Sequence, residues 1–133
     1  MSQWRLILTM LVVWILSIGL GSLIHGFLLA QDYGQVAQLY RPATDTHFIT
    51  IFIGYLAFAV GSVWLYSRGV EDKPWFGQGL RFGLAMWLVW PVASFLIEYA
   101  TQPVPESLVV KQLAYELVSK LILGVVTAAM IRR

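Results

Sequence analysis

Four ionisable side chains lie within or beside long apolar stretches of this 133-residue chain: His25, Glu98, Glu116 and Lys120. Glu116 precedes Lys120 by four residues, a spacing that places both side chains on one face of a helix. A carboxylate and an ammonium at this spacing can neutralise each other. Together with the histidine and the second carboxylate they would form a polar cluster, which could bind an ion, relay protons or hold a small polar ligand.

The depth of Lys120 decides between the interpretations of this cluster. Lys120 lies 12 residues before Arg132, which corresponds to about 18 Å of helix. In a hydrocarbon core of about 30 Å that is near the middle third, where inserting a charge costs about 2.5–3.5 kcal/mol. One interpretation is therefore a polar cluster that opens outward. Alternatively, the last helix lies further out and Lys120 reaches the interface, or the charges meet a partner protein within the bilayer.

Other kinds of chemistry lack a supporting pattern. His25 and His47 lie near the ends of adjacent apolar stretches, but no metal-ligand spacing such as HExxH surrounds them. The chain has no cysteine, which excludes disulfides and thiolate chemistry. No nucleophile motif and no phosphate-binding glycine loop is present. We expect no catalytic residue, no metal and no cofactor, and an enzyme is the least favoured class of function.

Composition indicates which solvent surrounds the chain. It is 59% hydrophobic and 12% charged, whereas a soluble domain carries about 25% charged residues. A net charge of +2 without a basic patch speaks against nucleic acid as a partner. The chain is predicted to be a single all-α domain over residues 1–133, an integral membrane four-helix bundle. The expected spans are about 6–29, 48–66, 77–98 and 110–131, the last preceded by a polar turn from Glu106.

The basic residues predict the orientation. The N-terminal end, the middle loop with its flank and the C-terminal end carry six of them, against Arg41 and Lys111 in the other two loops, leaving aside Lys120 within a span. Because basic residues gather on the cytoplasmic side, both termini and the middle loop are predicted to be cytoplasmic. The six residues are Arg5, Arg68, Lys73, Arg81, Arg132 and Arg133.

Small residues predict which face of each span packs inward, because they let helix backbones approach inside lipid. The second span aligns Thr50, Gly54, Ala57 and Gly61 on one side at helical spacing. Similar stripes on the other spans predict one compact bundle with the small and polar faces inward. Pro91 should bend the third span. The glycines expected to make the helix contacts are Gly21, Gly54, Gly61, Gly79 and Gly83.

Several short segments resemble small four-span bacterial inner-membrane proteins. They are Ile24-His25-Gly26, Leu39-Tyr40-Arg41-Pro42, Gly79-Leu80-Arg81-Phe82-Gly83-Leu84 and Gln102-Pro103-Val104-Pro105. The resemblance implies a bacterial inner membrane, and it supplies neither an activity nor functional residues.

The expected function is non-catalytic. The loops are too short to form a soluble catalytic domain, so we expect a small accessory subunit that packs against a larger membrane complex. The alternative is a small oligomeric transporter or channel that uses the outward-facing polar cluster. Membrane lipid, and either a larger membrane protein complex or further copies of the chain, are the expected partners.

Overall fold

The computed structural model describes residues 1–132. Arg133, one of the basic residues used to predict the orientation, lies outside the described residues. The described part is all-helical and contains four helices long and apolar enough to cross a membrane, which confirms the predicted all-α chain with four long apolar helices. These helical stretches are Gln3–Leu28, Phe48–Gly69, Trp75–Thr101 and Glu106–Met130.

Two of the four stretches contain a wider turn, and the first loop contains short helical pieces. The elements are α1 (Gln3–Leu23), the π-helical turn η1 (Ile24–Leu28), α2 (Ala30–Gly34), the 3₁₀ turns η2 (Ala37–Leu39) and η3 (Ala43–Asp45), α3 (Phe48–Gly69), α4 (Trp75–Trp87), the π-helical turn η4 (Leu88–Val92), α5 (Ala93–Thr101) and α6 (Glu106–Met130).

Local chemistry explains where the helices begin and where one of them widens. The Ser2 hydroxyl accepts a hydrogen bond from the Arg5 amide at 3.2 Å and caps α1. Pro74 and Pro105 stand immediately before α4 and α6, where a missing N–H costs nothing. Pro91 lies inside η4, so the structure accommodates it by a turn wider than an α-helix.

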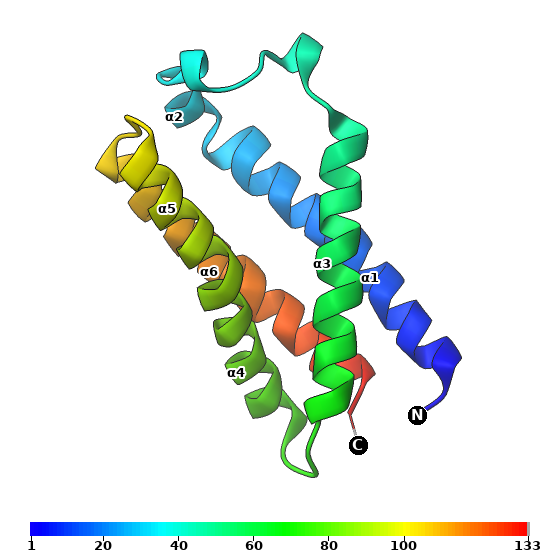
Figure 1. The fold of residues 1–133 in the computed structure, drawn as a ribbon. Coiled ribbons are helices and arrows are strands. Elements are labelled where there is room, and N and C mark those ends of the chain that lie inside the picture. Colours follow the sequence, from blue (N-terminus) through cyan, green and yellow to red (C-terminus); the bar gives the residue numbers. More distant parts are fainter. Residues whose placement is uncertain (133) are drawn as a thin grey trace.

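The helices pack as two hairpins joined through α1 and α6 (Figure 1). The closest backbone contacts join α4 to α6 and α1 to α3, and α1 also packs on α6. Both termini and the α3–α4 loop lie at one end of the molecule, and the connections after η1 and after α5 lie at the other. Between α3 and the α4–η4 segment the contact is made by aromatic rings, such as Phe58 on Trp90 with 4.8 Å between ring centres.

Glycines let α4 and α6 approach closely. A Cβ placed on Gly79 would lie 2.8 Å from the Val125 Cα, and one on Gly83 would lie 2.8 Å from the Leu121 Cα. Both distances are shorter than packed atoms allow. Gly124 of α6, which sequence reasoning did not single out, faces the same crossing, where its Cβ would meet Gly83. In the other hairpin Gly21 of α1 packs against the Tyr55 ring of α3.

Gly54 and Gly61 were also expected to make helix contacts, but they make none within the described chain. A Cβ on either would meet no atom within 4 Å among the described residues. The buried residues of α3 are Ala59, Ser62, Val63 and Tyr66, and all but Ser62 lie on the side of the helix opposite Gly54 and Gly61 at about 100° per residue. The prediction that these two glycines pack within the chain is wrong, because α3 contacts its neighbours through this other side and turns both glycines outward.

Candidate functional site

Glu116 and Lys120 form a buried ion pair in the middle of α6. Glu116 is 6% exposed and Lys120 is 3% exposed. The Lys120 ammonium donates to Glu116 Oε2 at 2.6 Å, as the four-residue spacing on a helix allows. Burial of both side chains means that each charge depends on the other, because neither has water to replace its partner.

His25 brings a third group to this pair from the other hairpin. Its Nε2 lies 2.8 Å from Glu116 Oε1, so the carboxylate contacts the histidine through one oxygen and the lysine through the other. On the far side of the ring, Nδ1 lies 2.7 Å from the Tyr33 hydroxyl of α2. The structure therefore brings together three of the four residues predicted to form the polar cluster.

The hydrogen bonds that link Gln112, Tyr33, His25 and Glu116 all have the same direction, since each group donates to the next one in this order. The Gln112 amide nitrogen of α6 can only donate, and it lies 2.9 Å from the Tyr33 hydroxyl oxygen. The Tyr33 hydrogen is then free to donate to His25 Nδ1. A neutral His25 consequently carries its proton on Nε2 and donates it to Glu116. With His25 neutral, the network holds one negative and one positive charge, which suits burial.

Aromatic faces complete the surroundings of the ammonium. The Lys120 Nζ lies 4.6 Å from the ring centre of Trp90 and 5.4 Å from that of Phe58. Such faces attract a cation, most strongly where water is excluded. Trp90 belongs to η4 and His25 to η1, so both π-helical turns supply a residue to the site. Turns of this kind occur frequently at functional sites.

Glu98 lies apart from the other three residues. The Tyr40 hydroxyl donates to Glu98 Oε1 at 2.6 Å, and the Tyr40 ring packs edge-on against Tyr33 with 5.3 Å between ring centres. Glu98 thus approaches the network only through two tyrosines. Burial raises the pKa of Tyr33 to about 12, and burial with the hydrogen bond to Glu98 raises the pKa of Tyr40. Both hydroxyls remain protonated donors at neutral pH.

A groove leads to the network from the end that carries the 31–47 connection. It encloses about 900 Å³ between α1, the 31–47 connection and α3. The His25 side chain is 29% exposed and forms the boundary between the groove and buried Glu116. Apolar side chains form most of the walls, among them Ile18, Phe48, Ile51 and Phe52.

The groove gives the network an entrance on the side of His25. Beyond Lys120, toward the end of α6, the core contains apolar residues such as Val13, Val63 and Leu123. The buried hydroxyls there, those of Thr9, Ser62 and Thr127, donate to backbone carbonyls of their own helices and do not extend the network. The arrangement can accept or pass a proton at the groove, or bind a small polar group there. The hydrogen-bond network of the described chain does not continue from Lys120 to the other end of the molecule, so it gives a proton no complete path across. Within residues 1–132 no group of three or more His, Asp or Glu side chains is placed to hold a metal ion.

Four aromatic contributors to the site escaped sequence reasoning: Tyr33, Tyr40, Phe58 and Trp90. Their only signal was aromatic character near the end or the middle of a span.

Comparison with protein-family models, curated proteins and solved structures finds no match. The site and the faces that the helices leave exposed therefore carry the functional interpretation.

Proposed function

We propose that this chain is a non-catalytic multi-pass protein of a bacterial inner membrane, with both termini and the α3–α4 loop on the cytoplasmic side. Four apolar helices of sufficient length support membrane insertion. The orientation is supported by the basic residues, most of which lie near the end that carries the termini. At the opposite end both basic side chains are paired, Arg41 with Asp45 and Lys111 with Asp32.

Within the membrane, the proposed role is that of a small accessory subunit that packs through α3 against a larger membrane complex. The observation that carries this proposal is the outward stripe of small residues Thr50, Gly54, Ala57 and Gly61. The first three are exposed, and a Cβ on either glycine would meet open space. No helix among residues 1–132 uses this face.

The physical argument rests on what small residues do in lipid. Lipid tails are as apolar as leucine, so hydrophobicity does not select a partner face, whereas small residues let two backbones approach and increase their contact. Glycine within a helix costs about 0.5–1 kcal/mol relative to alanine. A stripe of four small residues over three turns thus suits the close approach of a transmembrane helix from a partner.

The decisive experiment isolates the chain from its native membrane in mild detergent and identifies what accompanies it by mass spectrometry. We expect a larger complex with the wild type and its loss with Gly54→Leu/Gly61→Leu. The matched control is Ile53→Leu/Val60→Leu, which exchanges apolar residues on exposed positions of the same helix and should keep the complex. All three proteins should melt at similar temperatures when isolated. A wild type that purifies only as a monomer or homodimer contradicts the proposal.

Cysteine cross-linking provides a second, independent measurement, because the chain contains no native cysteine. A single cysteine at Gly54 should form cross-links to another polypeptide in native membranes. A single cysteine at Ala59, which is 0% exposed on the opposite face, should form none. Equal cross-linking at both positions would show that the small stripe does not define the contact.

A second candidate, a small oligomeric transporter or channel, is favoured by one specific observation: the groove reaches His25, and through it the buried Glu116–Lys120 pair. Because the polar network ends at Lys120 within the chain, a second copy would have to complete any pathway. Reconstitution into liposomes tests this candidate. Proton or ion flux that requires Glu116, from a clean homodimer, would favour it over the accessory role.

A further inference from the structure

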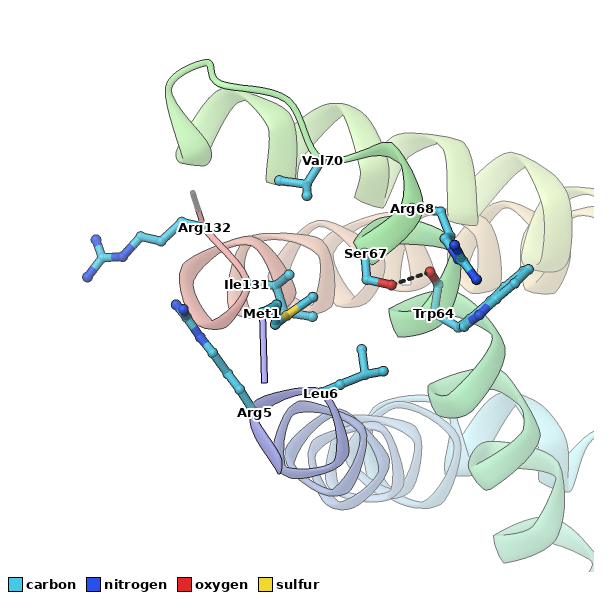
Figure 2. A pocket seen from close by; sticks show the side chains of 9 residues that line it. All are labelled: Met1, Arg5, Leu6, Trp64, Ser67, Arg68, Val70, Ile131 and Arg132. Atoms are coloured by element: carbon cyan, nitrogen blue, oxygen red, sulfur yellow. Dashed lines mark hydrogen bonds between the residues drawn. The ribbon is translucent and has the colours of Figure 1, made fainter. Parts of the chain in front are cut away.

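A second pocket lies at the opposite end of the molecule and has a different character. It encloses about 510 Å³ where the start of α1, the end of α3 and the end of α6 meet. Arg5, Arg68 and Arg132 line it, each from a different one of these segments, as Figure 2 shows. No Asp or Glu is among its lining residues within the described part of the chain.

The three arginines are held in place without losing their charge to a carboxylate. The Arg5 Nε donates to the Met130 carbonyl oxygen, which ties the start of α1 to the last turn of α6. The Arg68 guanidinium lies 5.4 Å from the ring centre of Trp64, and that of Arg132 lies 5.5 Å from the ring centre of Trp75. None of the three forms an ion pair within residues 1–132.

The remaining wall of the pocket is mostly apolar, apart from the Ser67 hydroxyl, which donates to the Trp64 carbonyl oxygen. Leu6, Val70 and Ile131 line it between the arginines, together with the Trp64 ring (Figure 2). Arg5 and Arg68 lie at its rim, and the Arg132 side chain extends outward from it (Figure 2), over the Trp75 ring. A pocket with cations at its rim and a mostly apolar wall matches an amphiphile better than a small, fully hydrated anion. Arginine is also well suited to phosphate, because its planar fork can donate two hydrogen bonds to phosphate oxygens.

We propose that this pocket binds the phosphate group of an anionic membrane lipid, with its glycerol and the first part of its acyl chains along Leu6, Val70 and the Trp64 ring. The inference rests on the membrane insertion and orientation proposed above, which place this end at the anionic cytoplasmic leaflet. Basic pockets between membrane helices on this side are suited to anionic head groups. It does not depend on the accessory role, because the isolated chain carries all of the lining residues.

Native mass spectrometry of the isolated chain tests the proposal. The protein, in a neutral detergent, is incubated with phosphatidylglycerol or with phosphatidylcholine of the same acyl chains. We expect the wild type to retain one phosphatidylglycerol and to discriminate against phosphatidylcholine. Each arginine changed to glutamine should weaken retention about fivefold, and all three together about a hundredfold.

The controls separate binding from folding and lipid from free phosphate. Lys111→Gln removes an exposed cation at the other end and should retain the lipid like the wild type. Because Arg5 also holds the end of α6, Arg68→Gln/Arg132→Gln leaves that bond intact and should still weaken retention about 25-fold. Equal retention of both lipids, or a triple variant that retains phosphatidylglycerol, overturns the proposal. The proposal is also overturned if inorganic phosphate raises the melting temperature of the protein as much as phosphatidylglycerol does.

Discussion

Removal of Glu116 should destabilise the chain more than removal of Lys120, although the two form one ion pair. Glu116→Gln leaves the ammonium of Lys120, which is 3% exposed, with only the faces of Trp90 and Phe58. Lys120→Met leaves the carboxylate with its hydrogen bond to His25 Nε2, so one of its two partners remains. The asymmetry follows from the position of the histidine and would not exist for an isolated pair.

The magnitudes follow from what each variant leaves buried. Loss of one partner from a buried pair costs about 3–5 kcal/mol, and we expect this for Glu116→Gln. Lys120→Met should cost about 1.5–3 kcal/mol, the range for one hydrogen bond to a charged group. The double variant removes both charges and retains similar volumes. It should therefore be less destabilised than the sum of the single variants by about 2 kcal/mol.

The assay is reversible unfolding in mixed micelles, with an increasing fraction of dodecyl sulfate and helical circular dichroism as the signal. It yields a free energy of unfolding for the wild type, the two single variants and the double variant. The matched control is the pair of Lys111 and Asp32, whose nitrogen and oxygen lie 2.9 Å apart but whose side chains are 49% and 20% exposed. Removing either partner there should cost about 1 kcal/mol or less.

Two outcomes would refute this reasoning. Additivity of the Glu116 and Lys120 variants within about 0.5 kcal/mol would show that the groups do not interact in a buried site. A larger loss for Lys120→Met than for Glu116→Gln would show that His25 does not compensate. In the second case the pair could still be buried, but the network that joins the two hairpins would be wrong.

Three further predictions concern packing, orientation and the tyrosines. Gly83→Leu should lower the melting temperature of the isolated chain, because the Cβ of the new side chain would collide with the α6 backbone. Gly61→Leu should change the melting temperature little, and equal effects of the two variants would contradict the assigned faces. A reporter fused within 31–47 should read as periplasmic and one within 70–74 as cytoplasmic, and the opposite pattern would reverse every statement about sides. In a spectrophotometric titration, Tyr33→Phe should remove one phenol that ionises near pH 12. The neutral Tyr33 hydroxyl stabilises the folded chain fully below about pH 10, and this contribution is lost as the pH rises toward 12.

The sequence predicted those features of the site that depend on spacing along one helix. Glu116 and Lys120 are four residues apart, so their pairing needs only a helix. The approach of His25 depends on how the two hairpins cross, and the roles of Tyr33 and Gln112 depend on the same crossing. Glu98 was assigned to the cluster by its depth and by its place on the expected inward face of the third span. Two residues at similar depth can still lie on different sides of a bundle, and Glu98 bonds to Tyr40 instead.

The fold shows the same division between what is local and what is tertiary. Helix length and hydropathy are local, so the four apolar helices could be predicted from composition and turn residues. The widened turns could not be predicted, although Pro91 marked one of them, because a proline can also produce a simple bend. Only the three-dimensional arrangement shows that this turn places Trp90 over the Lys120 ammonium.

The outward stripe of α3 shows why a correct physical rule can still predict the wrong contact. Small residues indicate where a backbone can come close, and at Gly83 the approaching backbone belongs to the same chain. At Gly54 and Gly61 no residue of the described chain comes close, because the rings of Tyr55 and Phe58 fill the space toward α4–η4 and turn the small residues away. The rule does not say whether the approaching backbone is intramolecular. The proposed contact of α3 with a helix of another protein rests for that reason on the face that the described chain leaves unused.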